Sequence, residues 1–410
     1  MKKQLLTAAI LCCLVIAGST AAPKSAKKKP KIPVSRVQTH MDGYLGDRID
    51  ACIRVRVCSE DPDLLVAPMR RQTETSLWQS EFWGKWTLGA IASYRYNKDP
   101  ELLRKIEGGV ESLLAAQQPD GYIGNYAPEA QLTNWDVWGR KYTMLGLLAY
   151  YDLTGDKAYY DRALGIADTY VRLQREDGSL PIKVDFVTGE PVNDACAMLH
   201  PLLRYFQRLK SDYGVETYAE AQAEGERWMR DVAIRNFDMT GQFEDVTVLG
   251  LQPYENLTNC TAAPYAAYLL SKEAPSAEDL ADAVDLARFS EDQFTFWDTP
   301  LTENGIKDKA TPCVYEQYKY QKPVDNSACN VADAMLSLYE ATGEEIYLAK
   351  GKALIDNITV VQNAVNGQIP TTWDFRPTKS DRNRTYWINC SYSSISSLLR
   401  LEKLLAERQK

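Results

Sequence analysis

The sequence predicts an all-α fold, an (α/α)6 toroid in which helical hairpins form a closed ring. A sequence repeat, which we call the repeated phrase, predicts two helices joined by a short Gly- and Asp-rich turn. It occurs three times, beginning at Tyr94, Tyr151 and Tyr339. Apolar residues recur at three- and four-residue spacing along most of the chain, and no long stretch alternates between polar and apolar residues. A fixed period of hairpins is typical of an array that buries each unit against the next, and about six units fit this length.

The turns of the repeated phrase set its period. The second helix of each copy follows an acidic residue, which is Asp99, Asp156 or Glu344. Asp99 and Asp156 lie roughly 57 residues apart, and Glu344 follows after roughly three more such steps. Asp120 and Asp177 recur in the closing turns, so we expect both to be turn residues. A ring of this kind presents its loops at the rim of a central funnel, a shape that suits a sugar chain.

The helical pattern begins in an N-terminal segment of residues 34–75, which contains one expected helix at 44–58. Gly, Pro and Asp residues separate the later helices. Two long connections, 298–327 and 366–390, are candidates for function because connections of this length are often functional. The expected helices are 85–96, 100–117, 140–153, 158–173, 195–210, 217–235, 263–271, 277–289, 330–341, 346–362 and 391–407.

The amino-acid composition restricts the number of domains and the classes of ligand that the chain is expected to bind. The chain has 410 residues and 45% hydrophobic content, enough for one large core, and the spread of the repeat indicates a single domain. The net charge of -8 argues against a nucleic-acid partner, whose phosphates require a basic surface. The 24 Tyr and 9 Trp combine a flat apolar face with a polar tip. Carbohydrate subsites use such side chains, and so does ordinary helix packing.

The N-terminus predicts export. Residues 1–22 resemble a signal peptide, with Lys2 and Lys3 before an apolar run that is too short to span a bilayer. Residues 23–33 are rich in Lys and Pro and predict a disordered basic leader. We expect residues 34–410 to form the (α/α)6 domain, which would be the catalytic domain if the chain is an enzyme. We expect a secreted or periplasmic bacterial protein with no membrane span.

The cysteines do not predict a disulfide framework or a zinc finger. Two of the nine lie in the signal segment, and an odd number remains. Cys52 and Cys58 lie close enough in sequence to pair, whereas buried free thiols are expected for the others. The mature chain has no Cys-x-x-Cys pair and no His cluster.

Three stretches carry a family resemblance. They are Trp-Gln-Ser-Glu-Phe-Trp-Gly-Lys-Trp at 78–86, Gln-Gln-Pro-Asp-Gly-Tyr-Ile at 117–123, and 138–156, which ends in Tyr-Asp-Leu-Thr-Gly-Asp. Together they resemble the six-hairpin glycosidases and, within that group, the β-L-arabinofuranosidase family, glycoside hydrolase family 127. The resemblance covers most of 40–180 and, more weakly, 325–400. It implies a glycoside hydrolase whose partner is an oligosaccharide or polysaccharide.

The resemblance also implies a zinc-bound cysteine nucleophile, with a Glu-x-Cys motif and a later Cys-Cys pair as ligands. Here Cys329 matches the first cysteine, but Ser327 stands where the motif has Glu. Cys390 matches the later pair, but its neighbours are Asn389 and Ser391. Two cysteines do not supply three or four ligands, so we expect no metal and no other cofactor. The family's β-domain is also absent from the pattern, which is consistent with a distant branch.

Glycoside cleavage usually requires two carboxylates, one as acid and one as base or nucleophile. Asp136 lies just before a helix, with Trp135 and Trp138 on either side. Burial against an indole raises the pKa of a carboxylic acid, so Asp136 is a candidate acid. Alternatively, it caps the helix.

The candidate partners of Asp136 lie in loops. Glu244 and Asp245 are adjacent in Gln-Phe-Glu-Asp and form either a site or a solvated turn. Glu316 lies among three tyrosines and forms either a site wall or a local packing cluster. Glu81 precedes Lys85 by four residues, so an ion pair within the helix is expected there. Expected substrate-binding residues are Trp83, Trp135, Trp138, Arg140, Tyr254, Tyr318 and Trp373.

Two alternatives remain open at the level of sequence. A polysaccharide lyase on the same toroid would use a tyrosine base, from Tyr315, Tyr318 or Tyr320, with Arg140 near the sugar carboxylate. A non-catalytic glycan-binding protein would explain the missing zinc motif. A sugar epimerase is disfavoured because the chain has only two His.

Overall fold

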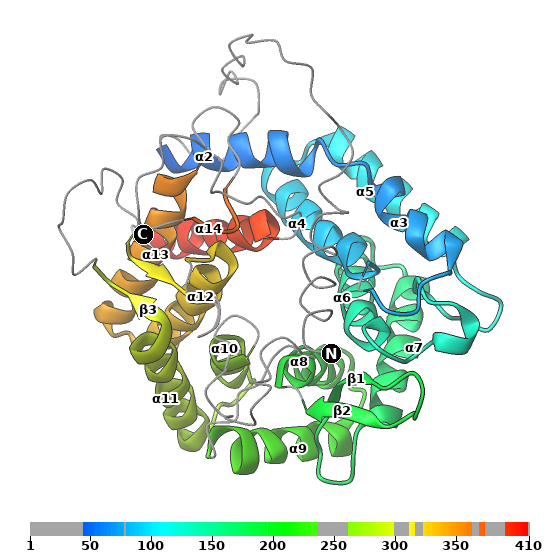
Figure 1. The fold of residues 1–410 in the computed structure, drawn as a ribbon. Coiled ribbons are helices and arrows are strands. Elements are labelled where there is room, and N and C mark those ends of the chain that lie inside the picture. The colour runs from blue at the N-terminus through cyan, green and yellow to red at the C-terminus, as the bar shows by residue number, and fades with distance from the viewer. Residues whose placement is uncertain are drawn as a thin grey trace, which may run out of the picture.

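The fold is a double ring of helices (Figure 1). The computed structural model describes residues 44–408 except 78, 195, 236–260, 299–310, 316–322, 363–368 and 374–389. The inner ring consists of α4 (Glu81–Asn97), α6 (Asp136–Thr154), α8 (Cys196–Tyr213), α10 (Ala263–Leu270), α12 (Asp325–Thr342) and α14 (Cys390–Glu407). The outer ring consists of α2 (Tyr44–Cys52), α5 (Pro100–Ala115), α7 (Lys157–Leu173), α9 (Ala219–Trp228), α11 (Ala277–Phe294) and α13 (Glu345–Val361), and α3 (Pro62–Arg71) packs on α5.

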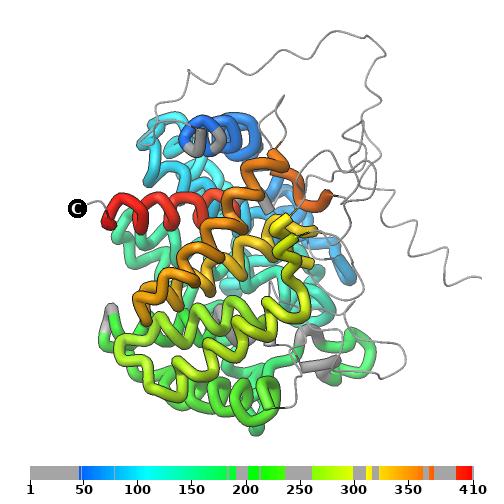
Figure 2. Tube along the Cα trace, turned by 90° about the vertical axis from the view of Figure 1, so that its left-hand side faces the viewer, coloured from blue at the N-terminus to red at the C-terminus, as the bar shows by residue number. Residues whose placement is uncertain are grey.

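The two ends of the chain close the ring. Helix α14 packs against α4, and α4 packs against α6, while α12 lies between α10 and α14. Helix α2 covers α14 from outside, so one hairpin combines the first and last described helices (Figures 1 and 2). This arrangement confirms the predicted all-α (α/α)6 toroid. Short π-helical segments, η2 (Ile53–Val57) and η4 (Met229–Ile234), extend α2 and α9, and a 3-10 turn, η3 (Pro128–Ala130), precedes α6.

The repeated phrase forms the hairpin turns. Asp99 and Asp156 cap α5 and α7, accepting hydrogen bonds from the backbone N–H groups two residues further on at 2.8 and 2.9 Å. Glu344 holds the same position before α13 but forms no such side-chain cap. Asp120 and Asp177 each accept a backbone N–H within their own closing turn, which confirms them as turn residues.

Glycines allow α4 and α6 to approach each other closely. A Cβ on Gly84 would lie 2.0 Å from the carbonyl oxygen of Tyr142, and one on Gly146 would lie 2.8 Å from the Trp83 ring. The backbone carbonyl cannot move aside without shifting α6. The close crossing therefore fixes how the first residues of the two helices face each other.

Replacing Gly84 by Ala should lower the free energy of unfolding by about 3 kcal/mol, because the added methyl group overlaps backbone of the neighbouring helix. Urea denaturation followed by circular dichroism measures the loss. Gly108→Ala is the matched control, since a Cβ there meets nothing within 4 Å in the middle of α5 and improves helix propensity. A Gly84→Ala midpoint equal to that of Gly108→Ala would contradict the close crossing.

Two short antiparallel hairpins interrupt the helices and were not predicted. Strand β1 (Pro181–Val184) pairs with β2 (Pro191–Asp194) between α7 and α8, and β3 (Thr295–Phe296) pairs with β4 (Cys313–Val314). The predicted signal peptide and leader lie outside the described residues. Within the described part of the chain, no helix combines the length and apolar character needed to cross a bilayer.

Candidate active site

The inner helices share one direction, because each is joined to the next through an antiparallel outer helix (Figure 1). Their N-terminal ends therefore lie at one end of the toroid. Three of them begin with a carboxylate, which is Glu81 in α4, Asp136 in α6 and Asp325 in α12. All three side chains are buried. The positive end of a helix dipole favours an anion at each of these positions.

Glu81 is held through one of its two oxygens. Its Oε2 accepts a hydrogen bond from Trp138 Nε1 at 2.6 Å and forms an ion pair with Lys85 Nζ at 3.0 Å. The pair with Lys85 confirms the sequence prediction, and the link to Trp138 is an addition from the structure. Within the described residues, Oε1 accepts no hydrogen bond. Glu81 thus has one oxygen fixed by an indole N–H and an ammonium group.

Two ammonium groups and two aromatic rings are linked to this carboxylate through Trp138 and Lys85. We call the group the Glu81 cluster, and it consists of Glu81, Lys85, Trp138, Lys141 and Tyr142. Lys141 Nζ lies 3.4 Å from the centroid of the Trp138 ring and 4.7 Å from that of Tyr142. Lys85 Nζ lies 4.6 Å from the same Tyr142 ring. Cation–π contacts of this kind fix both the lysines and the indole. Sequence reasoning missed Lys141, although its three-residue spacing from Trp138 is the signal that places both on one helix face.

Asp136 occupies a closed position beneath the turn that precedes α6. Its Oδ1 accepts a hydrogen bond from the Tyr122 hydroxyl at 2.8 Å, and its Oδ2 accepts one from the Leu132 N–H at 2.8 Å. The carboxylate has no exposed area. Burial raises the pKa of Asp136 above its ordinary value, although the nearby Arg140 opposes the shift. A Cβ on Gly124 would lie 3.0 Å from Asp136 Oδ1, so the surrounding loop is closely packed.

These contacts give Asp136 a structural role in joining the 117–123 turn to α6. Both oxygens are occupied, so a sugar cannot reach the carboxylate in this arrangement. The structure shows the expected burial and raised pKa, but the groups that bind the carboxylate are Tyr122 and the Leu132 N–H. Its role as the acid stays a prediction, which a variant described below tests.

The predicted aromatic subsites divide into two groups. Trp135 is half-buried and meets Trp138 edge to face at 6.3 Å, so both stay candidates beside Glu81. Trp83 has no exposed area, and its indole donates to the Gly109 carbonyl of α5. Trp373 is 3% exposed and packs in a small apolar cluster. Neither Trp83 nor Trp373 presents a face on which a sugar can stack in this structure, and their role in substrate binding stays a prediction.

Arg140 is also nearly covered. Its guanidinium lies 5.0 Å from the centroid of the Tyr122 ring, and the hydroxyl of the same tyrosine binds Asp136. The remaining predicted residues lie outside the described part of the chain and stay predictions. They are Glu244, Asp245, Tyr254, Glu316 and Tyr318.

The cysteines do not fit the family's zinc site. Cys329 is buried, and its thiol lies 3.5 Å from Ser394 Oγ, which in turn donates to Asp325 at 3.2 Å. Burial raises the pKa of the Cys329 thiol well above its ordinary value, which opposes formation of a thiolate. Among the described residues no group of three or more His, Cys, Asp or Glu is arranged to hold a metal ion. With Ser327 in place of the motif's Glu, these residues do not fit zinc.

The described cysteines form no disulfide, as expected for buried cysteines in a helical array. They include Cys52 and Cys58, so the pairing considered for those two residues does not occur.

Replacing Cys329 by Ser should leave kcat within about threefold of the wild-type value, since the thiol is a buried hydrogen-bonding group. The loss in stability should be about 1 kcal/mol, the typical worth of one buried hydrogen bond. Steady-state kinetics and urea denaturation measure the two effects. Complete loss of turnover in a folded Cys329→Ser protein would instead indicate a thiolate nucleophile.

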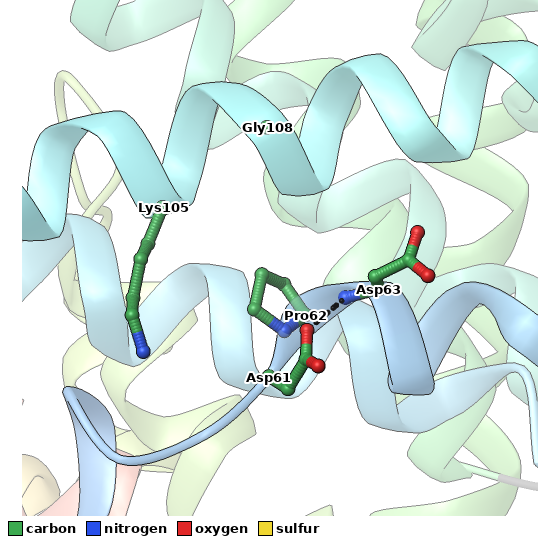
Figure 3. Close-up of a pocket in the computed structure, with 5 residues that line it drawn as sticks. All are labelled: Asp61, Pro62, Asp63, Lys105 and Gly108. Atoms are coloured by element: carbon green, nitrogen blue, oxygen red, sulfur yellow. Dashed lines mark hydrogen bonds between the residues drawn. The ribbon is translucent and has the colours of Figure 1, made fainter.

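A hollow on the outer ring is unrelated to this end of the toroid. It has a volume of about 490 Å³ between α3 and α5 and is lined by Asp61, Pro62, Asp63, Lys105 and Gly108 (Figure 3). Asp61 caps α3 by accepting the Asp63 N–H at 3.0 Å, and Lys105 donates to two backbone carbonyls. Its polar groups are thus used by the fold itself.

Residues 38–235, slightly less than half of the chain, match the family described as β-L-arabinofuranosidase, GH127 catalytic domain. The matched segment contains α4 and α6 and hence Glu81, Lys85, Trp138 and Lys141. No curated protein matches the sequence.

Three solved structures illustrate the fold. An unsaturated glucuronyl hydrolase from Streptococcus agalactiae has a TM-score of 0.59 at 12% identity, covering 92% of this chain and 98% of its own. A GH127 β-L-arabinofuranosidase from Geobacillus stearothermophilus T6 has a TM-score of 0.55 at 13% identity, covering 90% of this chain and 65% of its own. A D-mannose isomerase has a TM-score of 0.59 at 13% identity, covering 78% and 87%.

The structural likenesses establish the fold alone, which serves more than one reaction. The family match covers the segment that carries the Glu81 cluster, and it supports the prediction that the chain is a glycoside hydrolase. The chain is therefore an (α/α)6 toroid whose residues 38–235 match the GH127 catalytic domain, the family that its sequence resembles.

Proposed function

We propose that this protein is a secreted glycoside hydrolase that cleaves oligosaccharides by paired-carboxylate catalysis at the N-terminal end of its inner helices. The observation that carries the proposal is the Glu81 cluster within the segment that matches the family. A buried carboxylate is held there through one oxygen by an indole N–H and an ammonium group. Export is proposed from the signal-like sequence of residues 1–22.

Glu81 is the described carboxylate best placed to meet a substrate. A reacting carboxylate must approach the glycosidic bond to hydrogen-bond distance. Trp138 and Lys85 fix Oε2, and Oε1 remains to contact the sugar. The half-buried Trp135, which meets Trp138 edge to face, supplies aromatic surface beside it. We assign the second carboxylate to Glu244, Asp245 or Glu316, whose loops connect helices of the same ring.

The test is an assay of new reducing ends with the purified chain that begins after residue 22. The panel contains β-L-arabinofuranosides, pectic, arabinan and ulvan oligosaccharides, and oligosaccharides that end in an unsaturated glucuronyl residue. New reducing ends without a newly formed unsaturated uronate would support the hydrolase. Failure on the whole panel, with a folded protein that still binds a sugar, would favour the non-catalytic glycan-binding alternative.

The lyase alternative receives no support from the described residues. Burial raises the pKa of Tyr315 to about 12, which opposes its use as a base near neutral pH. Arg140 is 6% exposed and lies over the Tyr122 ring. The ultraviolet absorbance of a new unsaturated uronate, recorded in the same assay, separates the two reactions because hydrolysis forms no double bond.

A further inference from the structure

Helix α8 turns one face toward the space enclosed by the inner ring, which we call the bore. Tyr205, Phe206 and Leu209 are buried, and the Phe206 ring stacks on Tyr218 at the start of α9, 4.7 Å away. This face therefore points to the outer ring. On the opposite face, Arg204 is exposed and Arg208 is partly exposed. An exposed side chain in the middle of an inner helix indicates that solvent enters the bore.

Arg204 faces charged residues that come from across the ring. Burial of the guanidinium inside the ring lowers the pKa of Arg204. Asp333 on α12 opposes this shift, and Arg400 on α14 and Arg208 on its own helix add to it. Arg204 and Asp333 each follow the first residue of their helix by eight positions, a depth of about 12 Å at 1.5 Å per residue. Asp333 and Arg400 keep 30% and 29% of their side-chain area exposed. The residues thus form one accessible polar layer inside the ring.

The carboxylates near this layer are engaged by other groups. Arg208 binds Asp152 through two hydrogen bonds of 2.8 and 3.0 Å. Asp333 accepts the Ser397 hydroxyl at 3.1 Å and lies 3.7 Å from Arg400, which also pairs with Glu340. Arg204 forms no hydrogen bond and no ion pair within 4.0 Å to any residue in the described ranges. Its planar guanidinium therefore faces the bore without a close acceptor from the described part of the chain.

We propose that Arg204 binds the anionic group of an acidic sugar, a carboxylate or a sulfate, at this layer of the bore. A guanidinium matches both groups with two parallel hydrogen bonds. The neighbouring Arg400 and Arg208 add positive potential, and a bound anion would reduce the repulsion between the guanidinium groups. The inference rests on the proposed function and deepens it, because it names acidic oligosaccharides as the substrate class.

The experiment measures binding of three sugars by isothermal titration calorimetry, using D-glucuronate, D-glucose 6-sulfate and neutral D-glucose. Wild-type protein should bind at least one of the two anionic sugars about tenfold more tightly than glucose, the effect of one charged hydrogen-bonded contact. The preferred anion identifies the carboxylate or the sulfate as the ligand group. Arg204→Gln should abolish the preference. Lys403→Gln is the control, since it removes one positive charge from an exposed position on α14.

A second variant separates a binding role from a structural one. Asp333→Asn removes the carboxylate that faces Arg204, so it should tighten binding of the preferred anionic sugar. If Arg204 served only to stabilise the ring, both variants would lower the melting temperature and neither would change the preference for the anion. Equal wild-type affinities for the three sugars, or no binding of either anionic sugar, would overturn the inference. Hydrolysis of neutral oligosaccharides by the same protein would leave the proposed function standing.

Discussion

Replacing Glu81 by Gln is expected to lower kcat by about 10²–10⁴-fold, the usual contribution of a carboxylate that acts as general acid or base. Gln has the same shape, and its carbonyl oxygen can still accept the Trp138 N–H, so the fold should persist. The melting temperature should therefore stay close to the wild-type value. The measurement is steady-state kinetics on the substrate that the oligosaccharide panel identifies.

The chain provides a matched control for this variant. Glu291 accepts a hydrogen bond from Trp297 Nε1 at 2.9 Å and forms an ion pair with Lys350 at 2.6 Å. Its partners are thus of the same two kinds as those of Glu81, but it lies near the end of the outer helix α11. Glu291→Gln should leave kcat unchanged. If Glu81→Gln retained kcat within tenfold of the wild-type value, the ion pair with Lys85 would be structural, as it is at Glu291.

The ring was predictable because its signals are local and repeated. Asp99 and Asp156 mark the same turn in two hairpins, and the apolar spacing indicates the helices between such turns. Helix boundaries were less accurate where polar residues occupy the first turn. The helix expected at 330–341 begins at Asp325, because its first turn is polar and gives no apolar periodicity. The two short hairpins were missed because strands of two to four residues are too short to show alternation.

The candidate site was predictable in residue type but not in geometry. Sequence reasoning selected both Trp83 and Trp138, yet α4 turns Trp83 toward Gly109 of α5, whereas α6 turns Trp138 toward Glu81. This difference depends on the close crossing at Gly84, where α6 comes within reach of α4. No single-helix pattern encodes that crossing.

The placement of Asp136 also depends on a distant partner. The flanking tryptophans suggested a sugar site, but the group that binds the carboxylate is Tyr122, from the turn of the preceding hairpin. The turn sequence was identified as part of the repeat, and its tyrosine was not connected with α6. A repeat thus predicts where a turn lies more readily than it predicts which residue a side chain of that turn contacts.

Replacing Asp136 by Ala is expected to lower the free energy of unfolding by about 3 kcal/mol. The change leaves the Tyr122 hydroxyl and the Leu132 N–H without their acceptor in a buried place, and each such loss costs about 1–3 kcal/mol. Asn at this position can accept one of the two bonds and should cost less. Urea denaturation of wild type, Asp136→Asn and Asp136→Ala measures this order.

The pH dependence of the Asp136→Asn cost follows from the raised pKa of Asp136. Burial penalises the ionised carboxylate in the folded state, so its stabilising contribution is full at pH values below the unfolded pKa near 3.8. That contribution falls as the pH rises through the higher folded-state pKa. Because Asn does not titrate, the difference in stability between wild type and Asp136→Asn should shrink as the pH rises from acidic to neutral. A difference that grows over this range would show that Arg140 and the two hydrogen bonds outweigh burial.

The same variant decides between the structural and the catalytic roles of Asp136. If the carboxylate only joins the 117–123 turn to α6, the folded Asp136→Asn protein should keep kcat within about tenfold of wild type. A general acid contributes about 10²–10⁴-fold, so a larger loss with an unchanged KM would return Asp136 to the catalytic pair. In that case the Tyr122 hydrogen bond must open for substrate to reach it, and Tyr122→Phe should raise kcat rather than lower it. The structural role predicts that Tyr122→Phe lowers stability and leaves kcat unchanged.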